Sequence, residues 1–425
     1  MFIFGVALSL LWQNSPSSAQ QAANTLPTGG TVTSGSAIIA QNNNTMNINQ
    51  SSQKAIINWS TFNVGSAATV NFNQPNSQSS TLNRVNSASK SMIDGAVNAN
   101  GTVIFVNPNG IVFGKGAQVN TGSIVATTMN IADQDYLSEN NKKIFQGSAN
   151  GKIVNKGTIT ANNIDGYIAL MAPQVKNQGV IIATMSGNNS IALVSGEKVT
   201  LTFQGEQLLN VNVDASTIKS LIKNKILIQT NGGQAIIAAN AASDLKSSVL
   251  VNTGTISADG LNVKGGKVYL TASTIKQQGT VTASATSNSS GTRVEGGMIV
   301  ALANTIKLAS ASKTLATGDN GGGVITLSAA KKVNVKAGAL VDAGASAAGT
   351  CCETTQGRAL VGEACLYIQL ICVETVVVYG VGNSRSKNLS HDDCHFTISE
   401  SKDFIRAANV LVTNEVEHHT CFRCG

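Results

Sequence analysis

The 425-residue sequence has few charged side chains, few aromatic rings and little proline. Charged residues make up 12%, aromatic residues 4%, and proline occurs 5 times, whereas an ordinary globular domain is about 25% charged. Disorder is excluded because 42% of the residues are hydrophobic, and many are valine and isoleucine in periodic runs. The 41 glycines, with abundant asparagine, serine and threonine, indicate a long, regular β structure with polar corners.

The sequence also lacks a dense basic cluster. Its net charge of +7 is spread along the chain, and no group of lysines and arginines is interleaved with aromatic residues. Proteins that bind nucleic acids usually show such a cluster. We therefore predict no nucleic-acid partner and expect a mildly basic, well-solvated surface.

Histidine is absent before His391 and cysteine before Cys351. This excludes nucleophile–histidine–acid arrangements and histidine-ligated metals from the first 350 residues. Acidic residues there are scattered singly, and the close pair Asp133 and Asp135 is flanked by glutamine and tyrosine, whereas glycoside hydrolysis needs grouped carboxylates. The glycine run at 318–323 lacks the repeated nine-residue calcium pattern. We predict no enzyme, no metal site and no cofactor.

The N-terminus carries a short apolar run, Met1 to Leu11, followed by small residues around Ser17–Ala19. About eleven apolar residues are too few to span a bilayer, so we predict a signal peptide over 1–19 that is cleaved after Ala19. The alternative is a buried N-terminal helix or strand. No lysine or arginine precedes the run, so the signal is incomplete if the true start lies upstream. No later segment reaches 18 apolar residues.

Several segments share a pattern of glycine, an alternating apolar strand, a small-residue corner and a second strand. The longest copies are 166–183, 265–283 and 322–343. A shorter half of the pattern recurs as VNTGSIVA (119–126), VNKGTITA (154–161) and VNTGTISA (251–258). A unit of about 20–25 residues with two or three short strands cannot bury its own apolar face, so such units stack. Asparagines at the stacked corners are expected to form hydrogen-bonded ladders.

These repeats predict an all-β fold, a right-handed parallel β-helix (solenoid) with an N-terminal cap and a poorly defined C-terminal tail. A β-propeller needs four strands per unit and a longer period. An antiparallel meander or sandwich would need more two-residue Asn-Gly hairpin turns than the sequence contains.

The segment 93–128 contains a tight turn between two apolar runs. Val103–Val106 and Ile111–Phe113 read as strands, and Asn107, Pro108, Asn109 and Gly110 lie between them. Proline at the second position presets φ, and the asparagine before it and glycine at the end suit a type I turn.

The residues around this turn resemble the N-terminal secretion domain of two-partner-secretion exoproteins, the filamentous-haemagglutinin-like family of adhesins and haemagglutinins. The resemblance is close over about residues 25–201. It is carried by LPTGGTVTSGSA (26–37), AIINWSTFNVG (55–65), the block from Leu82 to Thr128 and the block from Gly151 to Ala183. Several separate motifs occur in the same order as in that family.

The resemblance implies a function in export. The chain would cross the inner membrane through the general secretory machinery and would then be recognised by an outer-membrane β-barrel transporter with POTRA domains. Asn107–Ile111 matches the family's secretion motif. Asn58, Trp59, Phe62 and Asn63 match a second family stretch. For both sets the alternative is a structural role, as a turn held against the core and as core or cap residues.

All seven cysteines and all four histidines lie after residue 350, where the glycine-corner pattern stops. Three hypotheses remain open for 351–425. The tail is a zinc-binding module, or Cys421 and Cys424 close a disulfide that resembles the C-terminal anchor of some family members, or the tail is a frameshifted or fused fragment. The odd cysteine count favours the last of these.

We accordingly predict a signal peptide (1–19), a two-partner secretion domain (20–201), a β-helix rod (202–350) and an unrelated tail (351–425). The predicted protein is a secreted or surface-exposed bacterial adhesin that reaches the outside through the periplasm and binds a host-cell or surface receptor. The alternatives are a carrier of a haemolysin or contact-dependent toxin and a structural matrix protein.

Overall fold

The computed structural model describes residues 21–147, 150–185, 187–214, 220–240, 248–287, 294–319 and 321–345, and the backbone of 375–379. The predicted signal peptide with its cleavage site at Ala19 lies outside the described residues. So do Cys421 and Cys424 and most of the predicted tail.

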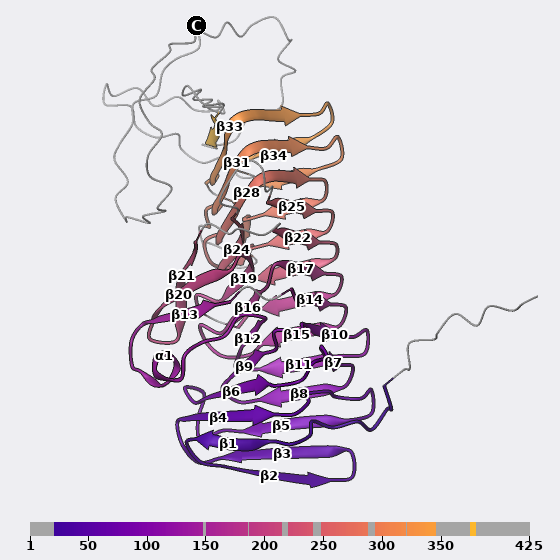
Figure 1. The fold of residues 1–425 in the computed structure, drawn as a ribbon. Coiled ribbons are helices and arrows are strands. Elements are labelled where there is room, and N and C mark those ends of the chain that lie inside the picture. Colours follow the sequence, from indigo (N-terminus) through magenta and orange to yellow (C-terminus); the bar gives the residue numbers. More distant parts are fainter. Residues whose placement is uncertain are drawn as a thin grey trace, which may run out of the picture.

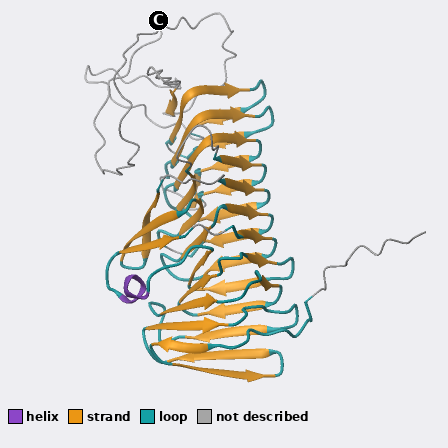
Figure 2. Ribbon diagram, in the orientation of Figure 1, coloured by secondary structure: helices purple, strands orange, loops and turns teal. Residues whose placement is uncertain are grey.

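The chain winds into a parallel β-helix whose coils stack along one axis (Figure 1). Each strand pairs in parallel with the equivalent strands of the coils below and above it. Nearly all of the described chain is strand or loop (Figure 2). The predicted fold class, an all-β parallel β-helix, is confirmed.

The rod has three faces, which we number in the order in which each coil visits them. The strands of the first face are β4 (Lys54–Trp59), β6 (Ser80–Val85), β9 (Thr102–Val106), β12 (Ser123–Thr127), β16 (Tyr167–Met171), β19 (Ser190–Ser195) and β24 (Gln234–Ala239). The strands of the second face are β7 (Ser91–Ile93), β10 (Ile111–Phe113), β14 (Lys152–Asn155), β17 (Gln174–Asn177), β22 (Leu221–Asn224) and β25 (Val249–Asn252). In the last coils, one long strand covers both faces, namely β28 (Lys267–Gln277), β31 (Met298–Leu308) and β33 (Val324–Val335).

The third face belongs to a separate 12-stranded sheet. Its parallel strands are β3 (Thr45–Gln50), β5 (Thr69–Asn73), β8 (Ala96–Ala99), β11 (Gln118–Thr121), β15 (Thr158–Ala161), β18 (Val180–Ala183), β23 (Leu227–Thr230), β26 (Thr255–Ser257), β29 (Thr280–Thr282), β32 (Lys313–Leu315) and β34 (Leu340–Asp342). A two-stranded sheet of β27 (Gly260–Leu261) and β30 (Ala285–Thr286) follows this face in two coils. The stacking continues past residue 201, because β23 pairs with both β18 and β26. The division into domains at 201 and 350 therefore stays a prediction.

Antiparallel strands close the N-terminal end of the rod, as the predicted cap requires. β1 (Thr31–Ser34) pairs antiparallel with β4, and β2 (Ala37–Asn42) forms a hairpin with β3. Asn43 in the hairpin turn adopts a left-handed φ of 51°. At the other end, β35 (Thr375–Tyr379) pairs antiparallel with β33.

The core is built from columns of equivalent side chains. On the third face, the inward residue of each strand lies opposite the inward residue of the next, and all of them are buried: Val70, Val97, Val119, Ile159, Ile181, Ile228, Ile256 and Val281. Such stacking buries apolar surface that a single coil would expose to water. The alternation that predicted the strands thus reflects inward and outward positions.

A buried amide ladder runs along the corner between the second and third faces. Asn155 donates to Asn177, Asn177 to Asn224, Asn224 to Asn252 and Asn252 to Gln277, over N···O distances of 2.8–2.9 Å. Each asparagine also donates to a backbone carbonyl of the following coil. The expectation of asparagine ladders at stacked corners is confirmed, and the ladder fixes the register between coils.

Replacing Asn224 by alanine is expected to lower the free energy of unfolding by about 1–3 kcal/mol, because the buried Oδ1 of Asn252 and the carbonyl of Thr255 lose their donor. Urea unfolding followed by circular dichroism measures this loss. Asn71→Ala is the matched control, since Asn71 belongs to a half-exposed ladder on the outer side of the third face and water can replace its bonds. Equal losses for the two variants would contradict a register role for the buried ladder.

The sequence patterns did not predict a small antiparallel sheet on the outside of the first face. This side sheet comprises β13 (Lys142–Gln146), β20 (Lys198–Gln204) and β21 (Gln207–Val213), and the helix α1 (Asp133–Leu137) lies beside it (Figure 1). It arises from two insertions between faces, and its inner side packs on the first face in a second apolar cluster that includes Phe145, Leu201 and Leu208. Strands of the first face are therefore buried on both sides.

Tyr136 of α1 anchors the helix to the rod. Its hydroxyl lies 2.9 Å from the carbonyl oxygen of Ser80 and 3.2 Å from that of Ala55. Burial of the ring raises the pKa of Tyr136 well above its usual range, because the phenolate would lose its hydration. Arg84 on the first face pairs with Asp133 at the start of α1. These contacts hold the insertion against the coils that carry the candidate site.

Candidate functional site

The predicted turn at residues 107–110 is the corner between β9 on the first face and β10 on the second. The amide of Gly110 donates to the carbonyl of Asn107 over 2.9 Å, which closes the four-residue turn that the sequence predicts. The buried side chain of Asn107 donates to the carbonyl of Ser89 and to the hydroxyl of Ser91, and its Oδ1 accepts from the amide of Asn109. Asn107 therefore ties the turn to the coil below it.

Two glycines let the turn lie flat against the next coil. Gly110 has a φ of +108°, which L side chains rarely adopt, and a Cβ there would lie 2.6 Å from the carbonyl oxygen of Lys152. A Cβ on Gly151 would lie 2.4 Å from the carbonyl oxygen of Pro108. A larger residue at either position would push the turn away from the coil above it.

The tip of the turn faces solvent. Pro108 and Asn109 are exposed, whereas Asn107, Gly110 and Ile111 are buried. Asn109 donates to the carbonyl of Ser87 over 2.7 Å, so its exposed side chain is held in place. The five residues of the predicted motif thus divide into a buried base and a rigid, exposed tip.

The second predicted segment contributes mainly to the core. Trp59 and Phe62 are each 1% exposed, and their rings meet edge to face with centroids 5.3 Å apart. The indole nitrogen of Trp59 donates to the buried side chain of Asn83 over 2.9 Å. Burial at this level leaves neither ring accessible to a partner of the folded rod.

The two asparagines of this segment remain half-exposed. Asn63 accepts a hydrogen bond from the backbone amide of Met92 over 2.8 Å, and thereby holds the end of its segment to the next coil. Asn58 lies on β4, between Thr31 of β1 and Arg84 of β6.

The structure brings the two segments together through one aromatic contact. Phe105, two residues before Asn107, lies 4.8 Å from Phe62 between ring centroids, and Phe72 completes the buried cluster. The base of the turn and the second segment therefore share one core. The residues that complete this arrangement and that the patterns missed are Asn83 and Ser91. Both stand in the block 82–128 that carries the family resemblance, but hydrogen bonds between side chains of different coils leave no pattern in the local sequence.

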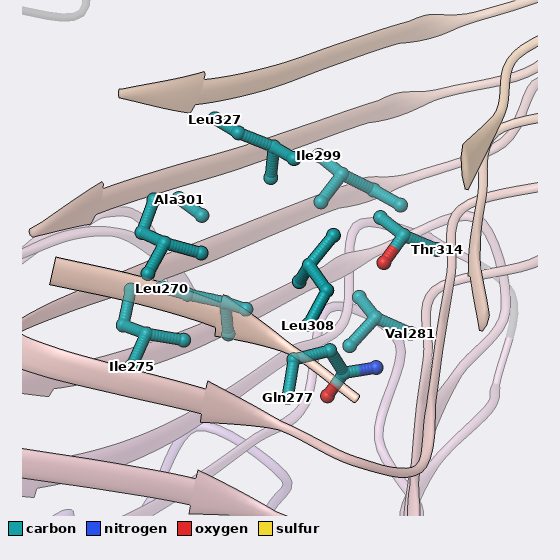
Figure 3. Close-up of a pocket in the computed structure, with 10 residues that line it drawn as sticks. Leu270, Ile275, Gln277, Val281, Ile299, Ala301, Leu308, Thr314 and Leu327 are labelled. Carbon is teal, nitrogen blue, oxygen red and sulfur yellow. The ribbon is translucent and has the colours of Figure 1, made fainter. Parts of the chain in front are cut away.

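Two hollows of the described rod differ in size and position. An interior cavity near the end of the amide ladder has a volume of about 10 Å³, enough for about one water molecule. Figure 3 shows Gln277, Leu308 and Thr314 among the side chains around it. It lies where the column of ladder amides gives way to Leu308. An open groove of about 260 Å³ crosses the asparagines on the outside of the third face.

Metal-binding clusters and membrane-spanning helices are both absent from the described residues. No group of three or more His, Cys, Asp and Glu side chains comes together there in a way that could hold a metal ion. Within the same ranges, no helix is long and apolar enough to cross a membrane.

Two forms of the heme/hemopexin-binding protein of Haemophilus influenzae are each 29% identical to this chain, over 264 residues (60% of this chain, 28% of the relative) and 250 residues (54% and 26%). The chain therefore spans less than a third of the length of these curated relatives.

Two solved secretion domains also resemble the rod. The crystal structure of the HMW1 secretion domain from Haemophilus influenzae matches with 26% identity and a TM-score of 0.54, and the match covers 74% of this chain and 100% of that one. The filamentous hemagglutinin secretion domain matches with 15% identity and a TM-score of 0.42, over 76% of this chain and 99% of that one. The model of the TPS secretion domain family matches residues 23–283. Since this match spans more than half of the sequence, the chain belongs to the family of proteins with a TPS secretion domain.

Proposed function

We propose that this protein is a bacterial adhesin or haemagglutinin-like exoprotein whose N-terminal domain directs its own export. Membership of the family implies export through the outer membrane by a partner transporter in a two-partner system. The finer proposal is that the partner is a dedicated β-barrel with POTRA domains, reached through the general secretory machinery. The exported chain then acts outside the cell or at its surface.

The observation that carries the export proposal is that the corner turn combines a buried base with an exposed tip. A buried asparagine with three hydrogen bonds fixes the base, and the proline and asparagine at the tip are exposed. A rigid tip loses little conformational entropy when a partner binds it. The proposed division of labour is that Pro108 and Asn109 contact the transporter, while Trp59 and Phe62 act indirectly by holding the core.

The adhesive role is supported by the shape of the rod. Stacked coils present long, regular faces, and repeat proteins bind through such extended area. The heme/hemopexin-binding relatives are matched over less than a third of their length, so we propose a host-cell or surface receptor and no haem ligand or other cofactor. The described residues before 351 contain no histidine to ligate haem iron.

Two alternative functions remain hypotheses. A carrier of a haemolysin or contact-dependent toxin needs a packed domain with converging polar residues after residue 350, a region that lies almost entirely outside the described residues. A structural matrix protein needs self-association of the rods. We propose no catalytic role, since neither the names of the relatives nor the arrangement of acidic residues indicates a reaction.

Co-expression of the full chain with its outer-membrane transporter tests the proposal. The chain is expected in the culture medium or on the cell surface when the transporter is present, and to be retained in the periplasm when it is deleted. The exported chain is then incubated with host cells and with uncoated plastic. Release without the transporter would contradict the export mechanism. Export without selective cell binding would contradict the adhesin role and favour the alternatives.

A further inference from the structure

The second face of the rod carries a row of stacked lysines. Lys176 lies opposite Lys223, Lys223 opposite Val251, Val251 opposite Lys276, and Lys276 opposite Lys307. Four of five successive strands thus place a lysine at the same outward position, and we call these four residues the lysine row. With about 4.8 Å between neighbouring strands, the row is about 19 Å long.

Within the described residues, no acidic group is paired with the row. The ion pairs of the described rod at Lys54, Arg84, Lys198 and Lys264 lie outside it. No Asp or Glu occurs in β17, β22, β25, β28 or β31. Like charges directly opposite each other in a sheet are destabilising, so the row costs stability unless an anion meets it.

The amide ladder beneath the row keeps the lysines aligned. Each lysine directly precedes the inward residue of the same corner column: Asn177, Asn224, Gln277 and Leu308. The hydrogen bonds from Asn177 to Asn224 and from Asn252 to Gln277 prevent a slip in register that would scatter the charges. Lys156 and Lys225, exposed at the adjoining corner, widen the basic strip near Lys176 and Lys223.

We propose that the lysine row is a binding site for a linear acidic polysaccharide that lies along the second face. A row one side chain wide and about 19 Å long matches a polymer with regularly spaced carboxylates or sulfates. The exposed large hydrophobic side chains of the described residues include no aromatic ring, so single-stranded nucleic acid would find no stacking platform. Val251, the apolar member within the row, is half-buried, so the row has no side chain that would insert into a membrane.

This inference specifies the kind of receptor for the proposed adhesive role, but it does not depend on export. The site lies on a different set of strands from the corner turn, and binding is measured on purified protein. Failure of the binding test would leave the export proposal intact, and failure of export in cells would leave the lysine row to be tested.

The test uses the full chain and its quadruple variant K176Q/K223Q/K276Q/K307Q. Binding to immobilised dextran sulfate and to polygalacturonate is measured by surface plasmon resonance, with neutral dextran as the blank. The variant is expected to bind at least about tenfold more weakly, since the two half-buried charges of Lys176 and Lys223 and the two exposed charges of Lys276 and Lys307 each contribute a modest amount. Wild-type binding is expected to weaken between about 0.1 M and 1 M salt, because the Debye length falls as the salt concentration rises.

A matched control removes the same charge from other surfaces. K115Q/K142Q/K267Q/K313Q changes four exposed lysines outside the row, and its affinity is expected to stay within about twofold of wild type. Equal weakening of both variants would overturn the proposal in favour of non-specific basicity. Binding to phosphatidylglycerol vesicles or single-stranded DNA, with none to either polysaccharide, would also overturn it. Circular dichroism checks that both variants keep the β fold.

Discussion

Replacing Phe62 by alanine is expected to lower the free energy of unfolding by about 3–5 kcal/mol. The ring is 1% exposed and lies within 4.8 Å of Phe105 and 5.3 Å of Trp59 between centroids. Its removal leaves a void between large rings that are fixed on three different strands, β4, β5 and β9, and cannot move together to fill it. Urea unfolding monitored by far-ultraviolet circular dichroism measures the change.

Phe203→Ala supplies the matched control, because it deletes the same group from the side sheet. Phe203 is half-buried and packs against Tyr167 with centroids 5.2 Å apart. Its loss is expected to cost about 1–2 kcal/mol, as less apolar surface returns to water. If Phe62→Ala cost no more than Phe203→Ala, the cluster would not be the centre of the N-terminal core.

The aromatic cluster also shows the limit of prediction from sequence. The pattern of AIINWSTFNVG indicated a core or cap role for Trp59 and Phe62, and their burial agrees with it. The contact of Phe62 with Phe105 could not be predicted, since it depends on which coil lies above which. Local alternation specifies the inward side of a strand, but the stacking order depends on loop lengths and insertions.

One of the repeat alignments was wrong for the same reason. VNTG at 119–122 and VNKG at 154–157 look equivalent, yet Val119 pairs with Ile159 on the third face, while Asn155 begins the amide ladder at the end of the second face. In both places an apolar residue and an asparagine near the end of a strand are followed by a glycine two positions later. The motif alone therefore does not identify the face. The alignment of 154–161 with 251–258 was correct, because Asn252 belongs to the same ladder.

The side sheet and the lysine row were missed for different physical reasons. Tyr167–Met171 is an unbroken apolar run, and all of its residues are buried. Such a run in a sequence indicates a strand that is covered on both sides. A cover over the first face could therefore have been predicted. The lysines of the row are tens of residues apart in sequence, so the even spread of charge along the chain concealed their alignment. Stacking of the coils can bring charges that are far apart in the sequence together on one face.

Replacing Pro108 and Asn109 together by alanine is expected to reduce export about tenfold, with less than about 1 kcal/mol change in the free energy of unfolding. Both residues are exposed at the tip of the corner turn, so their removal alters the surface that a transporter meets and leaves the buried base in place. Immunoblots of medium and cells, with the transporter co-expressed, measure export; urea unfolding of the purified variant measures stability.

Asn107→Ala separates recognition from folding. It removes three hydrogen bonds at the base and leaves the hydroxyl of Ser91 without its partner, so it is expected to cost about 1–3 kcal/mol and to reduce export as well. P75A/N76A is the matched control, since Pro75 and Asn76 form another exposed Pro-Asn pair, between β5 and β6, and export is expected to stay normal. If the tip variant is exported like wild type while Asn107→Ala is retained, the transporter reads the folded coil and not the turn. If the tip variant alone is retained at unchanged stability, the exposed proline and asparagine are the recognised element and the buried asparagine serves to present them.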